Sequence, residues 1–248
     1  MSVVYDMHAH TYELKDDEIE DILARDRGLV IVSVSDDPKS IVRTYELSRS
    51  YDQVIPCAGY HPWNFREGGS LEGVMESIRL AERLGVTCIG EVGLDRKFLP
   101  DDTWDIQVEA FKKFIELTSE VDGFLNIHSP GAWRDVLDMI SGRVERAMLH
   151  WYTGPLDLIP VVKDMGYYIS INPAIRIQEK HRRVAEYAPL DVIVFESDSP
   201  YNYRGLRLSP LMVRESIRIV AGIKGVDPNT VLEYSARNSS LLLGSPLG

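Results

Sequence analysis

The chain alternates short apolar runs with longer stretches in which apolar side chains recur at helical spacing. The runs carry apolar residues on both faces, which is typical of strands buried in a parallel sheet. We therefore predict eight strands. They lie at residues 3–7, 29–34, 54–60, 86–92, 123–128, 146–150, 167–172 and 191–197.

Amphipathic stretches between these runs predict helices. Ser70 and Ser209 stand where N-caps are expected, and Pro210 occupies the first helical position after Ser209. The Asp227-Pro228 pair begins a final helix in the same way. The predicted helices cover residues 17–26, 70–84, 105–118 and 209–221, and a last stretch that ends at about Leu243.

Strands that alternate with helices predict a (β/α)₈ TIM barrel, and 248 residues suit one such barrel. No Gly/Ser-rich linker divides the sequence, so we expect a single domain over residues 1–248. An open doubly wound sheet is the rival fold. That fold favours a glycine loop after the first strand, whereas histidines occupy this turn here.

Composition narrows the function classes. A formal net charge of -11 argues against broad, non-specific binding to duplex DNA. It still permits a nucleic acid that is held at its end by metal ions and a few arginines. Cys57 and Cys88 lie in apolar runs and are predicted to be buried free thiols. The N-terminus does not resemble a signal peptide, and no segment approaches the ~20 apolar residues of a membrane span. We therefore expect a cytoplasmic protein with no membrane contact and no obligate protein partner.

Ionisable side chains gather where the predicted strands end. The carboxyl ends of parallel barrel strands open on one face, so residues far apart in sequence are expected to converge there. His8 and His10 are spaced so that both rings can point the same way on a strand. His181 lies in a helical stretch and is predicted to be at the surface. The candidate metal ligands are His8, His10, Glu91, His128, His150 and Asp198.

Four histidines and two carboxylates suit Zn²⁺, Mn²⁺, Co²⁺ or Ni²⁺ more than Ca²⁺. Six ligands exceed the three that one catalytic zinc usually takes from protein. Two divalent ions roughly 3.5–4 Å apart, bridged by a carboxylate, are therefore expected. Asp6 is expected to bond a neighbouring backbone group or to orient a histidine.

At these residues the sequence resembles the TatD-type deoxyribonucleases of the amidohydrolase superfamily. The resemblance runs in order along nearly the whole chain, and its IGEVGLD and ESDSPY segments are the most specific. The matching segments are DMHAH at 6–10, GYHPW at 59–63, IGEVGLD at 89–95, NIHSP at 126–130, LHWYTG at 149–154, FESDSPY at 195–201 and ARNSSLLLG at 236–244.

The resemblance implies a two-metal site and DNA hydrolysis, as a 3'-5' exonuclease acting on single-stranded DNA or DNA ends. By position, His8, His10 and Asp198 would hold one ion. His128 and His150 would hold the second, with Glu91 bridging both. His61 would contact the scissile phosphate or a water near it. Zn, Mn, Mg, Co and Ni remain candidate ions.

In the mechanism that follows, Asp198 acts as the general base. The metal ions, helped by His61 or Arg96, stabilise the negative charge that develops on the phosphate. Trp63 and Trp151, with Tyr60, are candidates to stack on bases. Two alternatives stay open. The same site could hydrolyse a small amide, lactone or phosphoester, or the chain could be a metal-binding scaffold without turnover.

Overall fold

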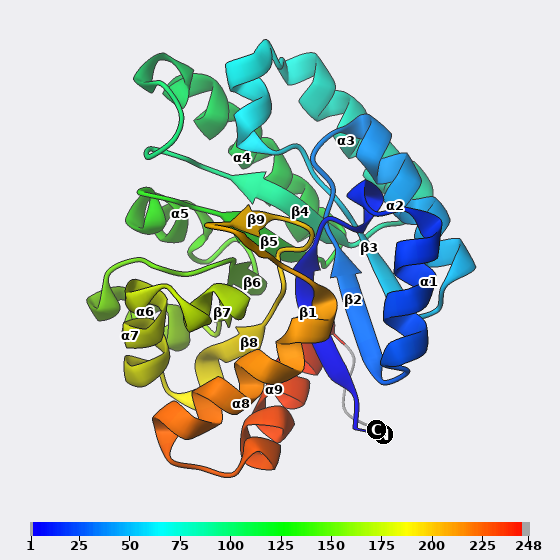
Figure 1. Cartoon of the computed structure of the whole chain (residues 1–248). Helices are drawn as coiled ribbons and strands as arrows, with labels where there is room; N and C mark the ends of the chain where they lie inside the picture. Colours follow the sequence, from blue (N-terminus) through cyan, green and yellow to red (C-terminus); the bar gives the residue numbers. More distant parts are fainter. Residues whose placement is uncertain (1, 245–248) are drawn as a thin grey trace.

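The computed structural model describes residues 2–244, and eight of its strands form one parallel sheet in sequential order, β1 to β8 (Figure 1). The sheet curls into a nearly closed barrel with helices outside it. Two hydrogen bonds join the first and last strands at the mouth, from the Asp198 amide to the His8 carbonyl (2.9 Å) and from the His10 amide to the Ser199 carbonyl (2.7 Å). The strands are β1 (Val4–Ala9), β2 (Leu29–Ser33), β3 (Val54–Ala58), β4 (Cys88–Gly93), β5 (Phe124–His128), β6 (Arg146–Leu149), β7 (Tyr168–Ile171) and β8 (Ile193–Phe195).

The predicted barrel is confirmed, and every predicted strand overlaps an observed one. The predicted helices are also present, and two expected caps form. The Ser70 hydroxyl accepts from the Gly73 amide, and the Asp227 carboxylate accepts from the Asn229 amide. Ser209 instead precedes a 3-10 turn that leads into α8. The helices are α1 (Asp16–Arg25), α2 (Pro38–Ser50), α3 (Leu71–Leu84), α4 (Trp104–Glu120), α5 (Trp133–Ile140), α6 (Ile159–Asp164), α7 (Glu179–Tyr187), α8 (Val213–Lys224) and α9 (Pro228–Leu242).

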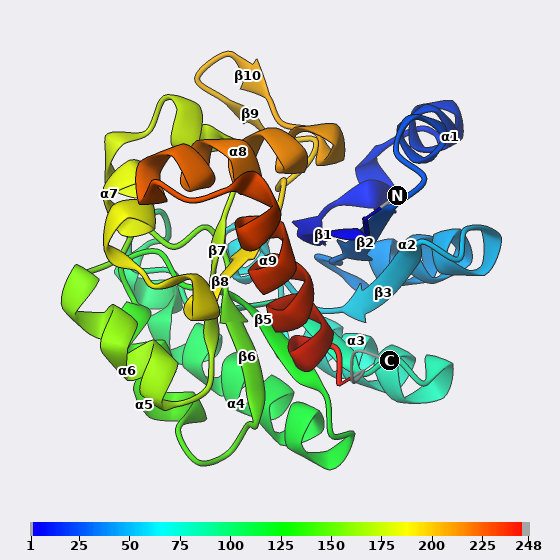
Figure 2. The same cartoon turned by 90° about the horizontal axis from the view of Figure 1, so that it is seen from below.

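Two pieces of backbone modify the simple barrel. A short hairpin of β9 (Asn202–Tyr203) and β10 (Leu206–Arg207) follows β8 and was not predicted. At the opposite end, α9 passes below the strands (Figure 2), and its residue Leu242 packs with the side chains of the barrel interior. No helix within residues 2–244 has the length and apolar character needed to span a membrane.

The barrel interior is filled by a layer of buried side chains that is distinct from the larger core between strands and helices. Cys57 of β3 and Cys88 of β4 belong to this layer. They are paired in register, with Cα atoms 4.4 Å apart, and form a disulfide. The prediction of free thiols is therefore wrong, although both cysteines are buried. The layer contains Met7, Val32, Val34, Cys57, Cys88, Phe124, Met148 and Val194.

The prediction that His181 lies at the surface is also wrong. His181 is fully buried under the barrel mouth, where its Nδ1 donates to the Tyr152 carbonyl (3.1 Å) and its Nε2 accepts from the Asn172 amide (2.9 Å). Helical spacing indicates this burial, because His181 lies on the same face of α7 as Val184 and Ala185, which are also buried. Burial lowers the pKa of His181 to about 4.

This histidine gives stability a defined pH dependence. Its folded-state pKa is depressed, so its contribution is fully present above the unfolded pKa of ~6.5 and is lost as pH falls toward 4. The free energy of unfolding should fall by about 3 kcal/mol across that window because of His181 alone. Burial raises the pKa of Asp6 to about 7. Because of this group, the free energy of unfolding should fall as pH rises toward 7, which is opposite to the effect of His181. Chemical denaturation of wild type and His181→Gln from pH 4 to 7 separates the two groups. A constant difference between the two proteins would contradict the assignment.

Candidate metal centre

The six predicted metal ligands converge at the carboxyl ends of the strands, and a fifth histidine joins them. Each histidine follows or ends a strand, so the barrel closes the distance between distant parts of the sequence. Six of the seven residues are buried, and the seventh, His10, is half-buried. The group consists of His8, His10, His61, Glu91, His128, His150 and Asp198.

Glu91 lies at the centre of this group. Its Oε2 is 3.3 Å from His8 Nε2 and 3.4 Å from His10 Nε2. Its Oε1 faces the other three rings, at 3.3 Å from His61 Nε2, 2.8 Å from His128 Nδ1 and 3.4 Å from His150 Nε2. One buried carboxylate therefore contacts all five histidines.

In each histidine, the ring nitrogen that faces away from Glu91 lies close to another protein group. His8 Nδ1 lies 2.7 Å from Asn126 Oδ1, and His128 Nε2 lies 2.9 Å from Asp95 Oδ2. His150 Nδ1 faces Glu196 Oε1 at 3.2 Å. Partners of this kind fix the tautomer and orientation of a metal-binding histidine.

The remaining two rings follow the same arrangement. His10 Nδ1 lies 3.3 Å from Asp36 Oδ1, and His61 Nδ1 accepts from the Trp63 amide at 3.1 Å. Asp36 also accepts from the Tyr12 hydroxyl, which extends the network outward. Every ring thus turns one nitrogen to the centre and the other to a protein group.

Most of these partners were not predicted from the sequence. A signal existed for Asn126, which lies two residues before His128 on β5 and so projects from the same face of the strand. Asp36, Asp95 and Glu196 lie in or beside loops, where strand periodicity gives no guidance. Their roles required the three-dimensional structure.

Asp6 does what was expected of it. Its Oδ1 accepts from the Ser197 amide at 2.7 Å and from the His8 amide at 3.4 Å, so it ties β1 to the segment after β8. Asp198 itself has φ 56, a left-handed conformation that few residues other than glycine adopt. The backbone that carries this ligand is therefore tightly constrained.

The centre is strongly coupled electrostatically. Burial alone raises the pKa of Glu91, but the positive charges of His61, His8 and His150 hold it well below its ordinary value. Burial lowers the pKa of His8, yet the charge of Glu91 outweighs this and raises it to about 9. Metal binding would have to displace these protons, because a ligand histidine must be neutral.

The geometry of the donor atoms fits a metal ion. In a tetrahedral site with bonds of ~2.0–2.2 Å, neighbouring ligand atoms stand about 3.3–3.5 Å apart. The two nitrogens His8 Nε2 and His10 Nε2 are separated by 3.3 Å. Asp198 Oδ1 lies 3.6 Å from the first and 3.2 Å from the second, and Glu91 Oε2 is at similar distances from both. The two nitrogens and the Asp198 oxygen are therefore spaced as ligands of one divalent cation would be, and Glu91 Oε2 is equally close to both nitrogens.

The donor atoms of the candidate ligands form several groups of close neighbours, each of which could hold an ion. His8, His10 and Asp198 form one group, as the sequence predicts. His128 and His150, which were expected to share an ion, fall in separate groups that both include Glu91: His150 with His8, and His128 with His61. His61 therefore stands among the candidate ligands as well as beside the expected phosphate position.

The predicted substrate contacts separate into two sets. Trp63 and Trp151 line the mouth, and their indole nitrogens donate to Asp95 and Gln178, respectively. Trp63 is 39% exposed and can meet a ligand. Arg96 instead forms a two-point ion pair with Asp135 and stacks over the Trp104 ring at 3.5 Å. Its guanidinium is therefore committed to the protein surface. Tyr60 is buried against Phe65.

The partners behind the histidines should matter for metal affinity. Asp95→Asn removes the charge that holds His128 Nε2 but keeps the size of the side chain. We expect metal to bind about 10–100-fold more weakly. Competition with a chelator of known affinity measures the change. Asp191→Asn removes an exposed carboxylate paired with Lys163 and is the matched control. Equal affinity in the two variants would contradict the role of Asp95.

Comparisons with known proteins show which family and fold this chain resembles. A family model described as TatD related DNase matches residues 5–244. The uncharacterized metal-dependent hydrolase YcfH of Escherichia coli is 29% identical, covering 96% of this chain and 94% of that protein. A Danio rerio relative with a provisional deoxyribonuclease name is 25% identical, covering 90% of each chain. The crystal structure of YjjV, a TatD homologue from Escherichia coli, superposes with a TM-score of 0.85 at 20% identity over 98% of both chains.

Proposed function

Because the chain belongs to the TatD family of metal-dependent hydrolases, we propose that it is a deoxyribonuclease that removes nucleotides from single-stranded DNA in the 3'-5' direction. Two divalent ions would be held, one by His8, His10 and Asp198 and the other by His128 and His150. Glu91 contacts both sets. The nitrogen and oxygen donors suit Zn²⁺, Mn²⁺, Co²⁺ or Ni²⁺, and Mg²⁺ is a candidate through the family resemblance.

One observation carries this proposal. A single buried carboxylate, Glu91, faces five histidine nitrogens at 2.8–3.4 Å, and each ring is fixed from behind. When the rings are neutral, as metal ligands must be, the buried carboxylate is costly to bury unless a cation compensates its negative charge. A purely structural role would not need five rings turned toward one point.

The chemistry is hydrolysis of a phosphodiester. Divalent ions, when bound, lower the pKa of a coordinated water toward ~7 and offset the charge of the phosphate. Asp198 lies beside His8 and His10 and accepts the proton of the attacking water. His61 and the exposed Trp63 orient the substrate, His61 at the phosphate and Trp63 against a base.

The assay for this proposal uses a single-stranded oligonucleotide labelled at its 5' end, incubated with the protein and Mn²⁺ or Mg²⁺. Stepwise shortening that produces a ladder of labelled fragments, and that EDTA blocks, is the expected result. A label placed at the 3' end should instead be released first as a mononucleotide. Release of mononucleotide from the 5' end would reverse the proposed polarity.

The alternative is that the same site hydrolyses a small amide, lactone or phosphoester, and these substrates are tested beside the oligonucleotide. Turnover of a lactone or of p-nitrophenyl phosphate without shortening of any oligonucleotide would replace the nuclease proposal. Bound metal without turnover on any of these substrates would instead favour a metal-binding scaffold.

A further inference from the structure

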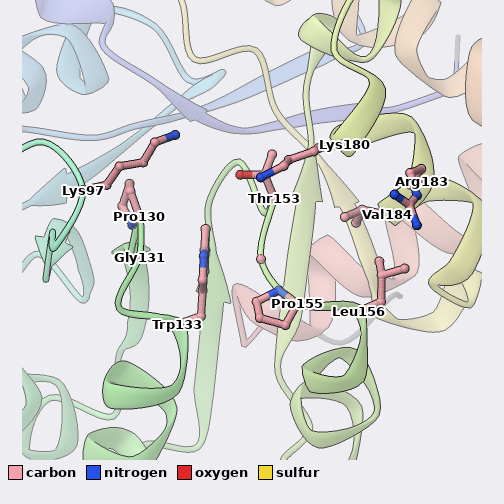
Figure 3. A pocket seen from close by; sticks show the side chains of 11 residues that line it. Lys97, Pro130, Gly131, Trp133, Thr153, Pro155, Leu156, Lys180, Arg183 and Val184 are labelled. Atoms are coloured by element: carbon pink, nitrogen blue, oxygen red, sulfur yellow. The ribbon is translucent and has the colours of Figure 1, made fainter.

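A cavity opens between the loops that follow β5 and β6 and the start of α7 (Figure 3). Its volume of about 490 Å³ lies within the range of ~300–1,000 Å³ that is usual for small-molecule sites. Trp133, Pro155 and Leu156 form an apolar floor. Lys97, Lys180 and Arg183 form the basic part of the lining. We call this cavity the basic pocket.

The basic pocket concentrates positive charge on an acidic protein. The chain has a net charge of -11, yet the lining residues include two lysines and an arginine and no carboxylate. Within residues 2–244, Lys180 and Arg183 form no ion pair, and the Lys97 amine lies over the Phe98 ring, 4.7 Å from its centroid. All three are exposed. Charges left without a partner on this surface are free to meet an anion.

The amines are arranged around the opening. Figure 3 shows Lys97 and Lys180 reaching from opposite sides toward Thr153, which lies between them. Arg183 follows Lys180 by three residues on α7, so both side chains project from one face of the helix. A phosphate at the rim would therefore be approached from more than one direction.

Residues that line the basic pocket follow candidate metal ligands closely in the sequence. Pro130 of its lining is two residues after His128, and Thr153 is three residues after His150. The β5 and β6 loops thus contribute one side chain to the metal centre and a wall to the pocket. The lining of the pocket therefore begins within three residues of two candidate metal ligands.

We propose that the basic pocket binds the nucleotide next to the one that is cleaved, with its phosphate at Lys97, Lys180 and Arg183 and its sugar and base against Trp133, Pro155 and Leu156. This inference rests on the proposed function. Free inorganic phosphate would use the rim but would leave the apolar floor uncovered. A nucleotide matches both parts, because it joins a charged group to a flat, weakly polar one.

The test measures binding without cleavage. The Mn²⁺-loaded protein is titrated into fluorescein-labelled oligothymidylate of eight residues with phosphorothioate linkages, which resist hydrolysis, and anisotropy is followed at several salt concentrations. The variant Lys180→Gln/Arg183→Gln should bind on the order of tenfold more weakly. The slope of log K against log salt should fall by about 1.4, which is the expected change for two phosphate contacts on a single strand.

The control removes the same charge elsewhere. Arg83 on α3 and Lys112 on α4 are exposed and lie outside the pocket lining, so Arg83→Gln/Lys112→Gln should leave the salt slope unchanged. Thermal melting verifies that both double variants are folded. Equal loss of binding in the two variants would overturn the pocket, because charge alone would then explain the effect.

The wild-type assay separates this inference from the proposed function. If wild type cleaves ordinary oligothymidylate and the pocket variant binds the phosphorothioate strand as tightly as wild type does, the pocket assignment fails while the nuclease stands. If wild type neither binds nor cleaves the strand, the nuclease fails and the pocket assignment fails with it.

Discussion

Replacing Glu91 by glutamine is expected to remove bound metal and, with it, measurable hydrolysis. Glu91 is 2% exposed and is the only described residue whose side chain lies within 3.4 Å of all five histidines of the centre. Glutamine keeps the shape but replaces one ligand oxygen by an amide that cannot bind a cation. The lost charge leaves the cation uncompensated in a buried site, which should weaken binding about a thousandfold.

Metal content after dialysis, measured by mass spectrometry, checks this expectation together with the rate on a labelled oligonucleotide. Glu116→Gln removes an exposed carboxylate on α4 and controls for the change in net charge. Circular dichroism verifies that the Glu91 variant keeps its barrel. A folded Glu91→Gln protein that retains the metal content of wild type would show that Glu91 is not the central ligand.

Asp198→Asn is expected to separate chemistry from metal binding. His8, His10 and Glu91 remain to hold the ion, and an asparagine oxygen can still face the two histidines. The amide cannot accept a proton from water, so kcat should fall by about 10²–10⁴-fold, the range usual for loss of a general base. Metal content should stay close to that of wild type.

Metal content and kcat, measured on the same preparation of Asp198→Asn, separate the two roles of this carboxylate. Full activity in the variant would remove Asp198 as the base. Loss of metal together with loss of activity would instead make Asp198 a ligand alone.

The fold was largely readable from the sequence because buried parallel strands leave an apolar pattern on both faces. The run at 54–60, for example, predicted β3, and Ser70 marked the start of α3. The helices α2, α5, α6 and α7 were expected only as connections between strands, without bounds, and the β9–β10 hairpin with its two-residue strands was not expected at all. The disulfide escaped for another reason. Only the register of β3 against β4 brings Cys57 and Cys88 together, and register is not visible in one sequence.

The candidate site was predictable as far as strand ends could place it. His8, Glu91 and Asp198 were expected to meet because parallel strands open on one face, and they do meet. Arg96 shows the limit of that reasoning. It follows β4 closely, yet its guanidinium turns to Asp135 because a free partner on α5 is available there. The direction of a loop side chain depends on such neighbours, which the local sequence does not reveal.

The most direct test of the central claim couples metal content to hydrolysis in one titration. The protein is stripped with a chelator, Mn²⁺ is added in steps, and bound metal and the rate of single-strand shortening are measured on the same sample. The rate should be undetectable in the stripped protein and should rise with bound metal until the centre is filled. Undiminished shortening by the metal-free protein, or a filled centre that never shortens DNA, would contradict the account.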